Sequence, residues 1–403
     1  TLAEIKDILA RKSYRAEEEA SGKRFFFPVD PTETGAALGG MAATNASGAR
    51  TLAYGPMRDW VAGLTVVLAD GSVTRLRRGC CPAEKSGTVG NGAGFSLKLP
   101  LEHGRAGGSD GSESAAQYRE VPMSPVNIPE GKHSGGYYLK PPFDAVDLFV
   151  GSEGTLGLIT ELELRLIDVP PGTETLYLMI FLSDDLPLEL VGALKKAESF
   201  SPIALEYMDR RSVELLEEFR REIGEASGVP GMPEGTAGLL YVEIGLEERE
   251  DFFRVRQEVA AVMAAHGIPE ERTWAGFSEK TLETMKKLRH ALPERINTVI
   301  AGRKTRFPEL TKIGTDIAVP AGRLEEMTAY SIDRIEKEGL EFCVFGHIGN
   351  GHLHINILPR NPGEIETAWA AEASERHEAY LRGEVKSEDG PSVLRELRRQ
   401  YGG

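Results

Sequence analysis

The sequence predicts an α+β protein built from two domains, the second of them based on an antiparallel sheet. The chain has 403 residues, 41% of them hydrophobic, which is enough to form more than one core. After Pro170-Pro171-Gly172, which looks like a linker, strand-like and helix-like segments alternate. That order is typical of an antiparallel sheet with helices packed on one face.

The first half of the chain is predicted to open with a helix and continue with short strands. Leu2, Ile5, Ile8 and Leu9 form one apolar stripe, which is typical of an amphipathic helix. An apolar run, an Asp-Gly turn and a second run then indicate a hairpin. The predicted elements are a helix over 1–11, strands over 61–68 and 72–76, a long loop over 79–145, and strands over 146–150 and 161–167.

The second half is predicted to be more regular. Strands are expected over 176–182, 203–208, 238–244 and 312–320, and helices over 186–198, 211–225, 248–266 and 323–337. The segment 282–295 is locally basic. A hairpin follows the last of these helices.

Composition excludes several classes of protein. Lys and Arg total 47 against 62 Asp and Glu, and the net charge of −15 argues against a general affinity for nucleic acid or anionic membranes. No apolar run has the length of a membrane span. Cys80, Cys81 and Cys343 form neither a disulfide framework nor a four-cysteine iron–sulfur site. We expect a cytoplasmic protein, with peripheral attachment to a membrane as the alternative.

Three of the eight histidines lie in the hairpin, within a stretch of eight residues. Asn350-Gly351 predicts a two-residue type I′ turn, which would place His347 opposite His354. Because side chains alternate along a strand, His347, His352, His354 and Asn356 would share one face. Imidazoles placed this way suit Zn²⁺, Mn²⁺ or Fe²⁺. The alternative is that these histidines only pack or form hydrogen bonds within a strand.

Two stretches of small residues precede the linker. Residues 34–50 are almost entirely small, and glycines at every third position mark 151–157. Such segments let the backbone approach a pyrophosphate or the edge of a flavin, or they form tightly packed turns. The second stretch is neither a Walker loop nor a Rossmann fingerprint, because the required residues do not follow.

Four blocks in order resemble a known family. Phe27–Pro31, Gly39–Gly48 and Gly151–Gly157 resemble the FAD-binding domain of the vanillyl-alcohol-oxidase/PCMH type. The block Gly346-His347-Ile348-Gly349-Asn350-Gly351-His352-Leu353-His354 resembles the metal motif of its D-2-hydroxyacid dehydrogenase branch. That branch includes D-lactate dehydrogenase and the catalytic subunit of glycolate oxidase. The resemblance extends over nearly the whole chain.

The resemblance implies a domain plan. Residues 1–169 would form the FAD-binding domain, with its first glycine-rich segment expected before Thr1. Residues 170–380 would form a ferredoxin-like cap that carries the metal-binding hairpin, and 381–403 would begin a C-terminal return segment.

The resemblance also implies site residues. The FAD contacts map onto Pro28, Asp30, Pro31, Gly39, Gly40, Thr44, Asn45, Gly48, Glu153, Gly154 and Ile159. Metal ligands map onto His347, His354 and Glu388, and substrate contacts onto Arg289, Lys312 and Asn356. An Arg–carboxylate pair would orient an acidic substrate for hydride transfer. For each basic residue taken alone, a solvated surface charge is the alternative.

The chain departs from the family pattern at the expected base. The family's Glu-His-Gly reads Glu388-Asp389-Gly390 here, and His352 stands where Asn is usual. A carboxylate near its ordinary pKa of about 3.9 is a weak base, so Asp389 would need a raised pKa. Either Asp389 or His352 is expected to take the proton, or activity is impaired.

The implied activity is FAD-dependent, metal-assisted oxidation of a D-2-hydroxy acid such as D-lactate or glycolate. A quinone, a cytochrome, an electron-transfer flavoprotein or an iron–sulfur protein would then reoxidise the flavin. A homodimer or a hetero-oligomer is expected. The alternatives are a non-redox flavoenzyme such as an alkyl-glycerone-phosphate synthase, a metal-dependent hydrolase and a catalytically silent subunit.

Overall fold

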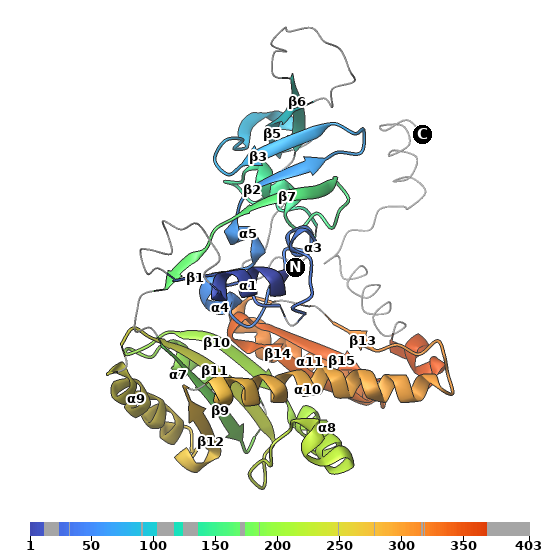
Figure 1. Ribbon diagram of the computed structural model, residues 1–403. Coiled ribbons are helices and arrows are strands. Elements are labelled where there is room, and N and C mark those ends of the chain that lie inside the picture. Colours follow the sequence, from blue (N-terminus) through green and yellow to red (C-terminus); the bar gives the residue numbers. More distant parts are fainter. Residues whose placement is uncertain are drawn as a thin grey trace.

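The structure is a computed structural model, and it describes most of the chain up to residue 368 (Figure 1). The described residues are 1–11, 24–31, 33–89, 92–102, 117–123, 136–169, 174–184, 186–248, 250–277, 279–315, 317 and 319–368. Glu388, Asp389 and the predicted return segment 381–403 lie outside them.

The residues before the linker are here called the N-terminal region, and its described part forms three small antiparallel sheets. The strand orders are β3-β2-β7, β4-β5-β6 and β1-β8. The strands are β1 (Arg24–Phe26), β2 (Val61–Val67), β3 (Val73–Arg77), β4 (Glu84–Val89), β5 (Gly92–Leu101), β6 (Gln117–Met123), β7 (Leu158–Leu164) and β8 (Ile167–Val169). The helices are α1 (Leu2–Ala10), α3 (Leu38–Ala43), α4 (Thr51–Tyr54), α5 (Met57–Trp60) and α6 (Ala145–Phe149).

Two predictions for this region are confirmed. Helix α1 begins after Thr1, whose hydroxyl accepts the amide of Glu4 in a capping box. Strands β2 and β3 form the predicted hairpin, with Val67 opposite Val73.

Two other predictions for the N-terminal region are wrong. The segment 79–145 contains β4, β5 and β6, and apolar residues of β5 and β6 join the core although the segment is rich in glycine, serine and proline. The run 146–150 is part of helix α6 instead of a strand. Asp144 and Asp147 form a capping box there, which stabilises a helical start for a short apolar run.

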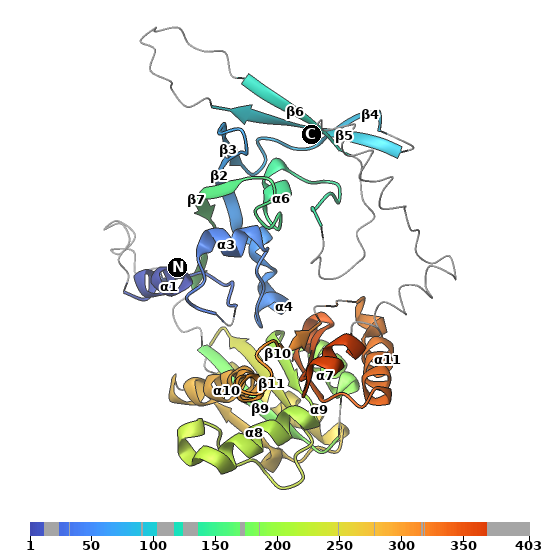
Figure 2. The same ribbon diagram turned by 90° about the vertical axis from the view of Figure 1, so that its right-hand side faces the viewer.

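The C-terminal region is built on a seven-stranded antiparallel sheet with the order β12-β9-β11-β10-β14-β15-β13 (Figure 1; Figure 2 gives the view turned by 90°). Its strands are β9 (Glu174–Leu182), β10 (Pro202–Met208), β11 (Gly238–Leu246), β12 (Thr273–Gly276), β13 (Ile313–Gly314), β14 (Phe342–His347) and β15 (His352–Ile357). Its helices are α7 (Leu188–Lys195), α8 (Arg210–Ile223), α9 (Asp251–Ala265), α10 (Glu279–Lys304) and α11 (Leu324–Lys337). Short 3-10 turns are η1 (Gly224–Ser227), η2 (Glu270–Arg272), η3 (Ala321–Arg323) and η4 (Ile348–Asn350).

Helices cover both faces of this sheet, so the prediction of helices on one face is wrong. Side chains of α7, α9 and α11 pack on one face, which we call the apolar face. Helices α8 and α10 pack on the opposite face. Strand β9 explains the difference, because its residues from Leu176 to Leu182 are all apolar, as in strands buried on both faces.

The last predicted strand is shorter than expected, because only Ile313–Gly314 of 312–320 pairs with β15 in the described part. The other predicted strands and helices of this region are confirmed to within a few residues at each end. Among the helices described, none is both long and apolar enough to cross a bilayer.

The two regions meet where α4 lies on β10 and on the turn η4 (Figure 1). Arg50, directly before α4, donates from Nε to Glu243 Oε2 of β11 at 2.7 Å. Leu52 of α4 packs against Gly349, where an added Cβ would lie 2.8 Å from Leu52 Cδ2. The segment after the first small-residue stretch therefore contacts the hairpin that carries the histidines.

Candidate functional site

A row of polar side chains crosses the sheet on the face opposite the apolar face. Glu206 of β10 lies opposite Tyr241 of β11, and His347 of β14 lies opposite His352 of β15. A hydrogen bond between Glu206 and His347 joins the two pairs. We call Tyr241, Glu206, His347 and His352 the polar row. Because strand side chains alternate, all four point to the face that α8 and α10 cover.

The register of the hairpin differs from the prediction. His347 pairs with His352 and Phe345 pairs with His354, so the predicted pairing of His347 with His354 is wrong. Instead of a two-residue turn, η4 and Gly351 connect the strands, with Gly351 at φ 67°. The slip is an even number of residues, so His347, His352 and His354 still share one face.

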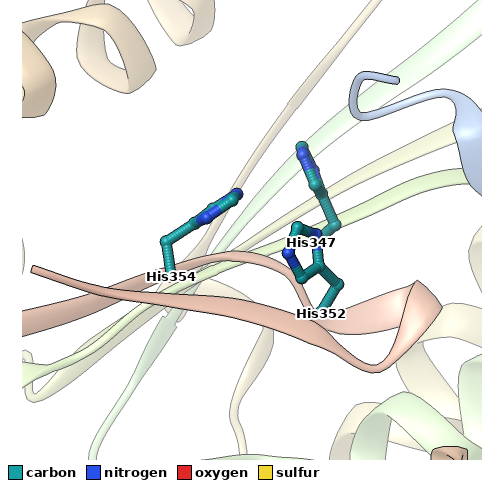
Figure 3. A group of neighbouring side chains, drawn as sticks. All are labelled: His347, His352 and His354. Carbon is teal, nitrogen blue, oxygen red and sulfur yellow. The ribbon is translucent and has the colours of Figure 1, made fainter. Parts of the chain in front are cut away.

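The three imidazoles gather at one point above the hairpin (Figure 3). One ring nitrogen from each histidine lies within 4.8 Å of the others. Ring centroids of His352 and His354 are 4.4 Å apart, and those of His347 and His354 are 5.6 Å apart. Metal–nitrogen bonds of about 2.1 Å at tetrahedral angles need nitrogens roughly 3.4 Å apart, so a small closure of the rings would complete such a set.

Two protein oxygens orient two of these rings. Glu206 Oε1 lies 2.6 Å from Nδ1 of His347, and the carbonyl oxygen of Thr315 lies 3.3 Å from Nδ1 of His354. Burial opposes the charged form of Glu206, but His347 and Arg289 outweigh it and hold the pKa of this carboxyl below its ordinary value. A carboxylate bonded to Nδ1 leaves Nε2 of the same ring to face a metal.

Arg289 lies beside this row on α10. Arg289 is four residues after Met285 and therefore lies on the same side of α10 as Met285 and Leu288, which face the sheet. It makes no hydrogen bond or ion pair with any residue that the structure describes. Burial lowers the pKa of Arg289, but Glu206 and Asp30 outweigh this and raise it, so the side chain stays charged. A largely enclosed cation without a direct partner is suited to an anionic ligand.

A cavity of about 370 Å³ opens beside Arg289 between the two regions. Its polar lining includes Asp30, Arg50, Glu243 and Arg289, and Phe25–Phe27 supply an aromatic wall. Burial raises the pKa of Asp30, and Arg50 and Arg289 offset this only in part. The cavity therefore combines mixed charge with an apolar side.

Lys312 and Asn356 lie on the other side of the histidines. Asn356 is 4% exposed, and its Nδ2 has no hydrogen-bond partner among the described residues. Lys312 is exposed, and its charge acts on Cys343, the strand partner of Asn356. The two predicted basic residues thus flank the histidines, Arg289 near Glu206 and Lys312 near Asn356.

The structure brings together the three blocks that resemble an FAD-binding domain, Phe27–Pro31, Gly39–Gly48 and Gly151–Gly157. The amides of Gly151 and Glu153 donate to the carbonyls of Ala42 and Ala43 at 2.9 and 2.8 Å. A Cβ on Gly48 would lie 2.2 Å from the carbonyl oxygen of Asp30, so glycine is required there. By contrast, a Cβ on Gly40 or Gly154 would stand in open space. These last two positions leave room for a ligand against the backbone.

The remaining residues of the predicted FAD site lie in the same part of the molecule. Gly39 faces the carbonyl of Ile159 across the blocks, at 3.4 Å from an added Cβ. Thr44 Oγ1 donates to the carbonyl of Gly40, and Asn45 Oδ1 accepts the amide of Arg58. Pro31 lines the cavity beside Asp30, and Pro28 is buried.

Sequence reasoning missed Glu206, Tyr241, Glu243 and Arg50. A signal was present, because β10 and β11 are apolar runs that each contain one glutamate at an inward position. Buried carboxylates are rare without a partner, so such a glutamate indicates a bonded or functional group. The pattern does not identify the partner, which comes from another strand or from the N-terminal region.

Comparison with known families now decides which group the chain belongs to. The profile described as "FAD linked oxidases, C-terminal domain" matches residues 176–388, more than half of the chain. The chain belongs to the FAD-linked oxidases. A second profile, described as "FAD binding domain", matches residues 12–77.

Several characterised proteins resemble this FAD-linked oxidase along most of its length. A D-lactate dehydrogenase of Archaeoglobus fulgidus is 26% identical over 82% of the chain and 56% of its own length. The glycolate oxidase subunit GlcD of Bacillus subtilis is 26% identical over 93% of the chain and 64% of its own. A D-2-hydroxyglutarate dehydrogenase of Stutzerimonas stutzeri is 25% identical over 85% of the chain and 58% of its own length. The chain thus spans a little over half of these relatives.

Solved structures show the same fold. A p-cresol methylhydroxylase with bound substrate superimposes with a TM-score of 0.54 at 14% identity, covering 95% of this chain and 65% of that one. An alkyldihydroxyacetonephosphate synthase superimposes with a TM-score of 0.51 at 14% identity, covering 93% of this chain and 59% of that one. The expected PCMH-type fold with an antiparallel α+β second part is confirmed.

Proposed function

We propose that this FAD-linked oxidase is a metal-assisted dehydrogenase of a D-2-hydroxy acid. The observation that carries the proposal is the set of three imidazoles beside the buried Asn356 side-chain amide nitrogen and Arg289, neither of which has a hydrogen-bond partner among the residues that the structure describes. Those groups match the hydroxyl and carboxylate of such an acid. Relatives named as D-lactate, glycolate and D-2-hydroxyglutarate enzymes support the same substrate class.

The residues present fit both cofactors. Open space against Gly40 and Gly154 would accommodate FAD along the joined small-residue blocks. The clustered imidazoles, with Glu388 as a carboxylate ligand from outside the described residues, would hold Zn²⁺, Mn²⁺ or Fe²⁺. When bound, FAD accepts a hydride equivalent and the metal acts as a Lewis acid.

The protein's own residues then bind and orient the acid. Arg289 and Lys312 hold the substrate carboxylate from the two sides of the histidines, and Asn356 Nδ2 donates to one of its oxygens. His352 is fully buried within 4.8 Å of the other imidazole ligand atoms, so we assign it to the metal set. Asp389 is then left to take the hydroxyl proton, in the place of the family's histidine.

The proposal includes a separate electron acceptor, because the proposed acids only reduce the flavin. A quinone, a cytochrome, an electron-transfer flavoprotein or an iron–sulfur protein would serve. The name of the Bacillus subtilis relative, a subunit of glycolate oxidase, supports assembly with another chain.

The visible absorption spectrum of the chain with FAD tests the proposal. We expect retained flavin that bleaches under anaerobic conditions with D-lactate, glycolate or D-2-hydroxyglutarate. Arg289→Lys keeps the charge but loses the two-point contact, so it should raise the acid concentration needed for bleaching at least about tenfold. Flavin that stays oxidised with all three acids would contradict the proposal and favour a non-redox flavoenzyme.

A further inference from the structure

We infer that Glu206 is a positioning residue for the metal site: its carboxylate fixes the ring of His347 with the Nδ1 proton toward Glu206 and Nε2 toward the metal. This inference rests on the proposed metal site and adds a group outside the ligand set. It concerns a residue of β10, a different strand from the two that carry the histidines.

The geometry is that of a carboxylate–histidine pair. Glu206 Oε1 and His347 Nδ1 are 2.6 Å apart, and the two side chains are 7% and 15% exposed. Directly opposed strand residues have Cβ atoms roughly 4.5–5.5 Å apart, so the bond is set by the register of β10 and β14. Met208 opposite Phe345 and Tyr207 opposite Gly346 fix that register.

The second oriented ring supports the same arrangement. The carbonyl oxygen of Thr315 lies 3.3 Å from Nδ1 of His354. A carbonyl can only accept, so this contact also requires a proton on Nδ1. In both rings Nδ1 then carries the proton, so Nε2 is the nitrogen whose lone pair could bind a metal.

A comparison of two buried glutamates shows why the role falls to Glu206. Glu243 is equally buried on the next strand, but it accepts from Arg50 Nε and from the hydroxyl of Tyr241. Glu206 makes no hydrogen bond to an arginine among the described residues, and it accepts instead from a histidine of the cluster. Glu243 therefore joins the two regions, whereas Glu206 serves the cluster.

The first test measures metal affinity directly. Co²⁺ binding to the full chain is followed by its visible bands and by competition with a chelator. Glu206→Ala should weaken Co²⁺ binding about 10–100-fold, the usual cost of losing an outer-shell partner. Glu206→Gln, whose amide oxygen still accepts from Nδ1, should restore part of the affinity. Glu243→Gln is the matched control and should change the affinity less than about twofold.

The second test needs no metal. Long-range ¹H–¹⁵N spectra of metal-free protein at pH about 8.5, above the ordinary histidine pKa of about 6.5, report which ring nitrogen carries the proton. The signal of His347 is identified by its absence from the spectrum of a His347→Gln variant. In the wild type this signal should show the Nδ1–H tautomer. An Nε2–H tautomer would overturn the inference.

The two tests separate the inference from the proposed function. Co²⁺ affinity that is unchanged in a folded Glu206→Ala variant overturns the positioning role alone. A wild-type chain that takes up no Co²⁺ contradicts the metal part of the proposed function, and the positioning role with it.

Discussion

The two faces of the C-terminal sheet differ in what their side chains do. On the apolar face, Leu178, Leu240 and Leu205 come from three neighbouring strands and are all less than 5% exposed beneath α7, α9 and α11. On the opposite face, their sequence neighbours Tyr241 and Glu206 belong to the polar row. The same strands thus supply packing on one side and chemistry on the other.

This difference shows where the sheet concentrates its functional groups. The opposite face is itself apolar at one end, where Met179, Phe181 and Leu239 meet α8 and α10. The polar row and Glu243 occupy the part that Arg50 of the N-terminal region reaches. The helices therefore stabilise the sheet from both sides. The site lies where the N-terminal region, instead of a helix, covers the sheet.

The largest effect is expected from removing the charge that the N-terminal region contributes. Arg50→Ala leaves Glu243, which is 2% exposed, without its cation, and breaking a buried pair this way costs about 3–5 kcal/mol. The free energy of unfolding from a urea titration measures the loss. Arg165→Ala, an exposed arginine, should stay within about 0.5 kcal/mol of the wild type. Equal losses in both variants would contradict an interface role for Arg50.

The next effect separates the two faces most directly. Leu240→Ala on the apolar face should cost about 2–5 kcal/mol of stability, because it leaves a cavity among fully buried side chains. Leu239→Ala, one residue earlier on the opposite face, should cost a similar amount. Neither should change Co²⁺ affinity more than about twofold. A large loss of affinity in Leu240→Ala would show that the apolar face also sets the metal site.

A smaller effect is expected at the turn between the histidine strands. Gly349→Ala would place a Cβ 2.8 Å from Leu52 Cδ2 and 3.0 Å from Leu205 Cβ, and such overpacking costs about 1–3 kcal/mol. Combining it with Leu52→Ala should recover most of the loss in a thermal unfolding scan. As a control, Gly192→Ala within α7 meets open space and should stabilise by about 0.5–1 kcal/mol.

The smallest effect concerns a thiol on the histidine-bearing face. Cys343 is fully buried, and burial together with Asp209 raises its pKa well above the ordinary range, so it stays protonated at pH 8. Iodoacetamide at pH 8 should label exposed Cys80 and leave Cys343 unlabelled until the protein is unfolded. Peptide mass mapping reads the result, and early labelling of Cys343 would show that this end of the face is open.

The sequence was most informative where residue type and alternation carry the signal together. Apolar runs identified β9, β10 and β11, and the alternation of His352 and His354 identified their shared face. The wrong register left that face intact, because the pairing error was an even number of residues. The resemblance alone assigned Gly39–Gly48 and Gly151–Gly157 to one FAD site, and the structure joins these two blocks through the bond of the Gly151 amide to the Ala42 carbonyl.

The remaining features depend on contacts that hydrophobic alternation alone does not encode. The run 146–150 is apolar except for Asp147, whose reciprocal bonds with Asp144 start a helix there. Glu206 and Glu243 look alike in sequence, and their different partners come from strands and loops distant in the chain. Glu388 and Asp389, outside the described residues, are still placed by resemblance alone.

The even-numbered slip also bears on how the histidine hairpin can change in length during evolution. Four residues separate His347 from its strand partner His352, and all four form the turn region. Adding or removing two residues there would return β15 with its imidazoles on the same side. A single insertion would rotate the whole strand, burying Leu353 and Ile355 among the ligands and sending the histidines into the apolar face. Length variants of this loop should therefore differ by pairs of residues.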